Sequence, residues 1–140
     1  LVIMARTDIR GVEGMEAAID RAKALEAAGA DAIFPEAMGT LAEFEQMRKA
    51  VSVPILANMT EFGKSELFTH EQLADVGVNM VIHPVSLLRV AFGAIERALD
   101  SLQSTGTLDG EVAGMQTRGR LYELLDYEAY NAFDAGIFTY

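Results

Sequence analysis

Blocks of consecutive apolar residues recur along the chain before residue 85. Residues 1–7 (LVIMART), 31–35 (DAIFP), 53–58 (VPILAN) and 78–83 (VNMVIH) form four such blocks. Strands covered on both faces of a parallel sheet need no alternation of polar and apolar positions, so these blocks predict four buried parallel strands. Helix-forming stretches follow each block, over residues 14–28, 40–50, a short segment ending near Gly77, and 85–103. The pattern therefore predicts four strand–helix units.

Capping signals delimit the predicted helices. Gly29 follows the first helix as a C-cap, where the left-handed backbone favours glycine. The pairs Thr40 with Glu43 and Thr69 with Gln72 have the spacing of a capping box, in which the two residues satisfy each other's backbone amides. Each signal indicates where a helix begins or ends.

Regular alternation of strand and helix predicts an α/β fold with right-handed crossovers, either an open doubly wound sheet or part of a closed barrel. Four units cannot close a barrel, and a complete (β/α)₈ barrel uses about 250 residues. We therefore expect residues 1–105 to be the C-terminal half of a (β/α)₈ TIM-type barrel. Residues 106–140 are expected to form a C-terminal extension with a Gly-containing connection and two short helices. Because Leu1 already lies inside a strand, we expect a truncated chain.

Composition limits the classes of function. With 51% hydrophobic residues over 140 positions, the chain can build one packed core. The formal charge of -10 repels phosphate backbones and makes a nucleic-acid surface improbable, so we expect small-molecule or protein partners and no membrane partner. No apolar run is long enough for a membrane span, and the first residues lack a basic stretch followed by an apolar stretch and a cleavage site, so we expect a cytoplasmic location. The absence of cysteine excludes a disulfide or a thiol catalyst within these residues.

Polar residues follow each predicted strand, at the edge of a parallel sheet where ligands bind. Arg6 offers a planar fork that matches a carboxylate, and a structural ion pair with Glu36 explains it equally well. For Glu36, a general base, a magnesium ligand through water and a counter-ion of Arg6 remain open, and spacing alone favours the counter-ion. Asn58 and Thr60 alternate along an extended backbone, so both can face one side as neutral hydrogen-bonding groups or serve as turn formers.

Other features of the sequence add no residue to the predicted site. His83 lies in an apolar run before a proline, which is typical of a core histidine, and we leave it out of the site. The sequence contains no phosphate-binding glycine loop, no HExxH motif and no carboxylate cluster with the spacing of a complete metal site.

Four segments resemble one enzyme family in identity, order and spacing. They are residues 1–8 (LVIMARTD), 34–37 (FPEA), 54–63 (PILANMTEFG) and 115–118 (MQTR). Together they resemble the 2-methylisocitrate lyases of the isocitrate lyase and phosphoenolpyruvate mutase superfamily, and the similarity covers essentially the whole chain. One departure is Ile9 with Arg10, where the family usually has smaller residues.

The resemblance implies a lyase that cleaves 2-methylisocitrate to pyruvate and succinate in propionate catabolism (the methylcitrate cycle). A base removes the hydroxyl proton, the carbon–carbon bond breaks, and a cysteine protonates the succinate carbanion equivalent. It further implies a Mg²⁺ ion whose direct ligands, like the KKCGH-like catalytic loop, lie before the stretch matching Leu1. A homotetramer with exchanged C-terminal helices is also implied.

The family's roles transfer to individual residues of this chain. Arg6 would clamp a substrate carboxylate, and Glu36 would sit near Mg²⁺ through water or orient Arg6; these two are the catalytic candidates. The other residues implied for substrate binding are Asn58, Met59, Thr60, Arg89 and Arg118, the last two with a helix-surface ion pair as a serious alternative.

Two further readings stay open. The chain could belong to another superfamily member, such as a carboxyphosphonoenolpyruvate phosphonomutase, an oxaloacetate-cleaving enzyme or an isocitrate lyase. It could instead be a half-barrel without catalysis, whose unpaired strand edges and open apolar interior would cause self-association.

Overall fold

Four short parallel strands follow one another in chain order in the computed structural model, which describes residues 1–63 and 65–137. They are β1 (Met4–Thr7), β2 (Ala32–Pro35), β3 (Leu56–Asn58) and β4 (Met80–Ile82). β1 pairs with β2 and β3 pairs with β4, in both cases parallel. One isolated parallel bridge, Ile33 with Ile55, connects the two pairs. The predicted order of parallel strands is therefore confirmed, and all four carboxyl ends point the same way.

The helices lie where the sequence predicted them, with small shifts at their ends. Those in the strand-containing part are α1 (Arg10–Glu13), α2 (Met15–Ala27), α3 (Leu41–Ala50), α4 (His70–Asp75) and the start of α5 (Ser86–Thr105). Only α1, a single turn directly after β1, was not predicted. Its four residues give too short a pattern for helical periodicity to register.

The capping signals behave differently at the two predicted boxes. Thr69 and Gln72 form a complete box, in which each side chain accepts from the other's backbone N–H. At α3 the Thr40 hydroxyl accepts from the Glu43 N–H, but the Glu43 carboxylate binds elsewhere. Gly29 has a φ of 98°, which explains why glycine ends α2.

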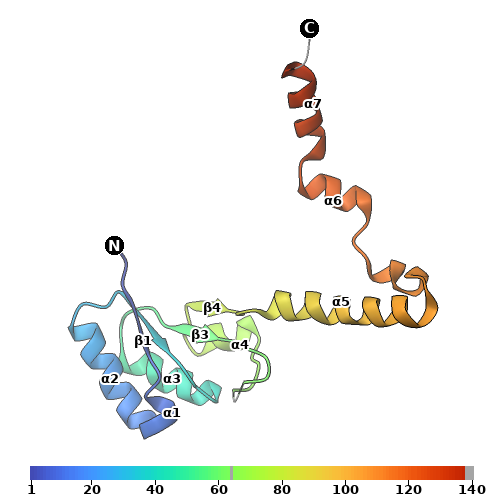
Figure 1. Cartoon of the computed structure of the whole chain (residues 1–140). Coiled ribbons are helices and arrows are strands. Elements are labelled where there is room, and N and C mark those ends of the chain that lie inside the picture. The colour runs from blue at the N-terminus through green and yellow to red at the C-terminus, as the bar shows by residue number, and fades with distance from the viewer. Residues whose placement is uncertain (64, 138–140) are drawn as a thin grey trace. The chain divides into compact units, whose positions relative to one another are not determined.

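The core lies between the strands and the helices that cover one face of them (Figure 1). α2 buries Ala18 and Ala22, whose small side chains let the helix approach closely, and Ile19 and Leu25 pack beside them. Each fully buried large side chain contributes about 1.5–3 kcal/mol through the hydrophobic effect. The largest of them are Phe44, Ile33, Met38, Met47, Ile55, Met59 and Leu73.

The described chain divides into two compact units, Leu1–Val90 and Ala91–Tyr140. The second unit contains most of α5, then the 3₁₀ helix η1 (Asp109–Gly114), α6 (Arg118–Leu124) and α7 (Tyr127–Ile137). The two short terminal helices were predicted, whereas η1 falls in the segment expected to be a plain connection. No described residue of these helices is buried, although Tyr122 and Tyr127 stack with ring centroids 4.4 Å apart.

The described helices do not have the properties of a bilayer span. None of those within residues 1–63 and 65–137 combines the length and the apolar character that crossing a membrane demands.

Candidate active site

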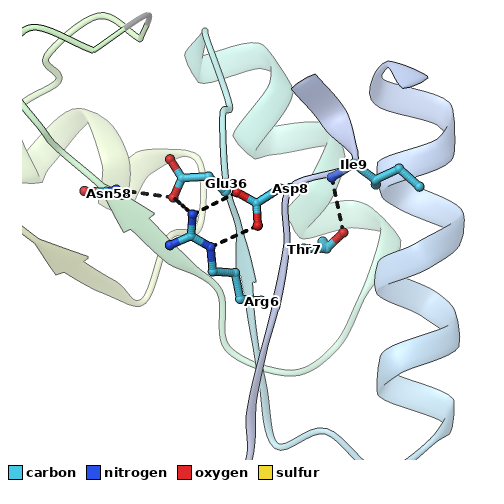
Figure 2. A network of polar contacts seen from close by, with 6 residues as sticks. All are labelled: Arg6, Thr7, Asp8, Ile9, Glu36 and Asn58. Carbon is cyan, nitrogen blue, oxygen red and sulfur yellow. Dashed lines mark hydrogen bonds and ion pairs between the residues drawn. The ribbon is translucent and has the colours of Figure 1, made fainter. Parts of the chain in front are cut away.

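Three strand ends bring their polar side chains together. Arg6 lies on β1, Glu36 follows β2 directly, and Asn58 ends β3 (Figure 2). Arg6 Nη2 lies 3.6 Å from Glu36 Oε2, and Asn58 Nδ2 donates to the same oxygen at 3.3 Å. The prediction that these three residues converge at the carboxyl edge of the sheet is confirmed.

Asp8 is the main partner of Arg6, and the sequence analysis did not select it. Arg6 Nε and Nη2 donate to the two carboxylate oxygens of Asp8 at 3.0 and 2.8 Å. This hydrogen-bonded contact lowers the pKa of the Asp8 carboxyl and raises the pKa of Arg6. The negative charge of Glu36 raises the pKa of Arg6 further, to a smaller extent. The available signal was the two-residue spacing, which places both side chains on the same side of an extended backbone.

The orientation of the Arg6 guanidinium leaves one nitrogen available. Its Cζ lies 4.9 Å from the ring centroid of Phe34, the residue opposite it on β2. Among the described residues, Nη1 has no hydrogen-bond or ion-pair partner, while Asp8 and Glu36 occupy Nε and Nη2. An anion reaching this site can therefore bind at the Nη1 end of the fork.

Glu36 fixes the orientation of the Asn58 side-chain amide. Since Asn58 Nδ2 donates to the Glu36 carboxylate, Oδ1 points the other way, and it is buried with no partner among the described groups. An unsatisfied buried acceptor is costly, so a ligand or water that donates a hydrogen bond satisfies it. The free atom of Asn58 is thus an acceptor, in contrast to the donor expected for carboxylate binding.

A pocket of about 260 Å³ adjoins this network. Asn58 and Thr60 both line it, so the expectation that they face one side is confirmed. Ser65 closes part of its wall, because its hydroxyl donates to the Met38 carbonyl at 2.6 Å. The lining residues are Pro35, Glu36, Ala37, Met38, Phe44, Asn58, Thr60, Gly63 and Ser65.

Met59 is placed differently from its neighbours. Its side chain is only 1% exposed within the core, and its backbone N–H donates to the Ile82 carbonyl at 2.9 Å. The Met59 amide is therefore engaged in joining β3 to β4.

Arg89, at the start of α5, holds the loop that follows β3. Its Nη1 donates to the Glu61 carbonyl at 2.8 Å and lies 3.5 Å from the Thr60 hydroxyl. It also forms an ion pair with the Glu61 carboxylate, and its Cζ lies 5.5 Å from the Phe62 ring centroid. Arg118 belongs to the second unit, where it is the first residue of α6 and is exposed.

Arg10 links the start of α1 to the first turn of α3. Its Nη2 lies 2.5 Å from Glu43 Oε1, and the other Glu43 oxygen accepts from the Gly39 N–H. Burial alone would raise the pKa of the Glu43 carboxyl, but the hydrogen bonds from Arg10 and Gly39 hold the pKa below its ordinary value. Arg10, the departure from the family pattern, thus has a defined partner.

His83 is not a core histidine, so that expectation was wrong. It is exposed, and its Nε2 lies 3.0 Å from Nε2 of His70. The apolar run before it ends one residue earlier, at Ile82, where β4 ends.

A known protein family matches most of this chain. The family model described as phosphoenolpyruvate phosphomutase matches residues 1–103. The chain belongs to this family.

Curated relatives in the family are considerably longer than this chain. It is 57% identical over 139 residues to the probable 2-methylisocitrate lyase 2 of Corynebacterium glutamicum, covering 99% of this chain and 45% of that protein. It is 47% identical over 129 residues to the 2-methylisocitrate lyase of Escherichia coli, covering 92% of this chain and 44% of the relative. The chain therefore spans about half the length of the curated relatives it matches.

Solved structures similar to this family member share its mixed α/β fold. A crystal structure of oxaloacetate acetylhydrolase has a TM-score of 0.82 at 29% identity, covering 98% of this chain and 48% of that one. A phosphonopyruvate hydrolase complex with oxalate and Mg²⁺ has a TM-score of 0.77 at 25% identity, covering 96% and 48%. The crystal structure of 2,3-dimethylmalate lyase, a member of the phosphoenolpyruvate mutase and isocitrate lyase superfamily, has a TM-score of 0.79 at 27% identity, covering 97% of this chain and 48% of that one, and the chain shares the fold of this superfamily.

The described residues of this family member do not form a magnesium site by themselves. Mg²⁺ requires about six oxygen ligands in octahedral geometry, several of which are usually waters. Within residues 1–63 and 65–137, no three His, Asp or Glu side chains converge on one point. Glu36 Oε2 is already shared by Arg6 and Asn58, so Glu36 could reach an ion only through its other oxygen or a water.

Proposed function

We propose that this chain is the C-terminal half of a 2-methylisocitrate lyase, which cleaves 2-methylisocitrate to pyruvate and succinate in propionate catabolism. The observation that supports it most is the 57% identity to a probable 2-methylisocitrate lyase over nearly the whole chain. Arg6, which Asp8 and Glu36 hold at the strand ends, supplies the positive charge that a carboxylate substrate needs.

In this proposal the four strands and their helices are the last four units of a (β/α)₈ barrel. Residues 1–105 form those units, and residues 106–140 form the helical extension that is exchanged in a cytoplasmic homotetramer. The exposed apolar side chains of α7, including Tyr130 and Phe133, support a role for this extension in subunit contact.

Each site residue has a proposed task that follows from its contacts. Arg6 binds a substrate carboxylate at its Nη1 end, while Asp8 holds the rest of the guanidinium in place. The fixed positive charge then stabilises negative charge on the pyruvate part of the substrate. Asp8 is a positioning residue, because it acts through Arg6.

Glu36 and Asn58 act as a pair. Glu36 orients both Arg6 and the Asn58 amide, so that Asn58 Oδ1 accepts from a donor on the substrate or on a bound water. Thr60 presents its hydroxyl from the same pocket wall to the succinate part. Arg89 donates a hydrogen bond to the Thr60 hydroxyl, so its proposed part in substrate binding is indirect, through Thr60.

Met59 and Arg118 are the remaining proposed substrate-binding residues. Met59 contributes to substrate binding only through its backbone carbonyl, since its N–H is engaged. Arg118 is proposed as a substrate-binding residue on the resemblance of the MQTR segment alone.

The direct Mg²⁺ ligands and the acidic thiol are proposed to come from the part of the relatives that this chain does not match. Bound Mg²⁺ would neutralise negative charge on the pyruvate oxygens.

Another superfamily reaction is the alternative. The structural similarity to oxaloacetate acetylhydrolase favours it, since the TM-score is 0.82. Both enzymes would cleave a carbon–carbon bond next to carboxylates, and both would need the Arg6 site. The two proposed reactions differ in their substrate, which is 2-methylisocitrate in one and oxaloacetate in the other.

The test is a coupled assay of the full-length gene product with 2-methylisocitrate and, separately, with oxaloacetate. Mg²⁺-dependent release of pyruvate and succinate in equal amounts is the expected result. Oxalate and acetate from oxaloacetate, with no turnover of 2-methylisocitrate, would replace the proposal by the alternative. The 140-residue chain assayed alone should release no pyruvate, because its described residues form no magnesium site and its sequence contains no thiol.

A further inference from the structure

The loop that follows Glu36, residues 37–39, contains a strained residue. Ala37 has a φ of 66°, a left-handed conformation that costs energy for any residue with a Cβ atom. Such a conformation persists only where surrounding contacts enforce it, and it often occurs next to functional groups. The contacts of this loop with the rest of the protein therefore determine the position of the chain directly after Glu36.

Hydrogen bonds fix the loop at both of its ends. At the start, the Glu36 N–H donates to the Thr7 carbonyl at 3.0 Å. At the end, the Gly39 N–H donates to Glu43 Oε2 at 2.5 Å. Between the two, the Met38 side chain is buried in the core. A change at the Gly39 end is therefore transmitted along a short, tightly held segment to Glu36.

Arg10 fixes Glu43 in turn. Its Nη2 and Nε donate to Glu43 Oε1 at 2.5 and 3.2 Å, which leaves Oε2 for the Gly39 amide. Both side chains are partly buried, so salt screens this pair less than it screens exposed pairs. α1 also approaches the loop directly, since a Cβ atom added at Gly11 would lie 3.7 Å from that of Ala37. The pair thus ties α1, next to β1, to the loop after β2.

A movement of the loop would affect the candidate site through the Glu36 carboxylate. Figure 2 shows this carboxylate between Arg6 and Asn58. Its Oε2 lies 3.6 Å from Arg6 Nη2 and accepts from Asn58 Nδ2 at 3.3 Å. Both distances are long for such contacts, so even a small outward movement of Glu36 would lose them.

We propose that the Arg10–Glu43 pair clamps the loop of residues 37–39 and thereby positions the Glu36 carboxylate at the strand ends. Arg10 and Glu43 are positioning residues, because they act through the loop and do not line the pocket. Arg10 stands where the family usually has a smaller residue, so the resemblance does not imply this clamp. Its effect on catalysis rests on the proposed function, whereas its effect on the loop does not.

Kinetics of the full-length enzyme test the clamp through a double-mutant cycle. Glu43→Ala should lower kcat/KM for 2-methylisocitrate at least roughly fivefold. In a Glu36→Gln background the same change should cost less than about twofold, because the clamp acts through Glu36. Equal losses in the two backgrounds would overturn the proposal.

Glu26→Ala is the matched control for lost stability. The Glu26 carboxylate accepts from the Ser52 and Val53 amides, which precede β3 at the opposite end of the strands from the site. This variant should have a lower unfolding midpoint and an unchanged kcat/KM. A loss of kcat/KM as large as that of Glu43→Ala would show that general destabilisation explains both.

Hydrogen exchange of the full-length protein tests the clamp without reference to activity. Followed by mass spectrometry, peptides that contain the Glu36 amide but end before Gly39 should exchange faster in Glu43→Ala and Arg10→Ala than in the parent protein. Glu26→Ala should leave their exchange unchanged. Parent-like exchange in both clamp variants would overturn the proposal. A parent protein without lyase activity would refute only the proposed function, because the exchange rates still decide whether the clamp exists.

Discussion

Arg6 and Asp8, two residues apart on the same strand end, form a two-point contact in which Nε and Nη2 each donate to a different carboxylate oxygen. The contact uses one side of the guanidinium and leaves Nη1 free for a ligand. Both side chains are more than half exposed, so their pairing contributes little to stability. The contact matters for orientation instead, because it determines which nitrogen of the guanidinium is left for a ligand.

Replacing Asp8 by Asn should therefore impair substrate handling more than folding. We expect kcat/KM of the full-length enzyme to fall roughly tenfold, since Arg6 loses the charged partner that orients it. The unfolding midpoint should hardly change. Glu45→Gln is the matched control, because Glu45 forms an exposed ion pair with Lys49 on α3; an equal loss of activity in both variants would contradict the orienting role.

Replacing Arg6 by Lys tests the fork itself. Lysine keeps the charge but cannot contact Asp8 at two points and a substrate carboxylate at the same time, so kcat/KM should fall by at least roughly tenfold. Steady-state kinetics of the full-length enzyme measure this. Arg120→Lys, in an exposed pair with Glu123 on α6, should leave the rate unchanged. Near-normal turnover by the Arg6 variant would remove Arg6 from the site.

The Arg10–Glu43 ion pair should stabilise the fold. Its side chains are 34% and 16% exposed, and Glu43 also accepts from the Gly39 N–H. We expect Arg10→Ala to lower the free energy of unfolding by about 1–3 kcal/mol, since a partly buried carboxylate loses a charged donor. A double-mutant cycle with Glu43→Gln, measured by urea unfolding, should give a coupling energy clearly different from zero; additive effects would mean that the pair contributes nothing.

The pH dependence of that pair has a defined sign. The folded protein lowers the pKa of Glu43, so its contribution is fully present above the ordinary glutamate pKa of about 4.3 and is lost as the pH falls through the lowered value. The parent chain should lose more stability than Glu43→Gln when the pH is lowered from 6 to about 3. Parallel slopes for the two proteins would show that Glu43 titrates alike in the folded and unfolded states.

The sequence predicted the order of elements well and the partners of side chains less well. Hydrophobic blocks and capping residues are local signals, and they located β1 to β4 and every helix but α1 and η1. Arg6, Glu36 and Asn58 were placed together because the carboxyl ends of parallel strands meet at one edge. Which donor meets which acceptor depends on side-chain directions that the pattern does not contain, and so Asp8 was missed.

His83 is a second residue whose surroundings a local sequence pattern did not predict. An apolar run before a proline suggested burial, but the strand ends at Ile82 and the histidine lies beyond it. Its partner, His70, is 13 positions away on another element. No local pattern relates the two, since only the path of the folded chain from α4 to the end of β4 brings them together.

The isolated chain should self-associate. Among the described residues, β1 pairs only with β2 and β4 only with β3, so each outer strand keeps a free edge. Apolar side chains such as Leu1, Ile3 and Leu99 are also exposed. Size-exclusion chromatography of the 140-residue chain should give an apparent mass well above 15.2 kDa, and a monodisperse monomer at micromolar concentration would contradict this.

Among the described residues, only the bridge between Ile33 and Ile55 joins the two strand ladders, so the sheet has a seam at this point. The hydrogen bond from Asn58 to Glu36 crosses this seam just beyond the strand ends. A slight widening there would part the two side chains before any ladder broke. The alignment of the carboxylate site is thus governed by the packing of two isoleucines beneath it, and enlarging or shrinking either one would misalign the site while both strand pairs remained intact.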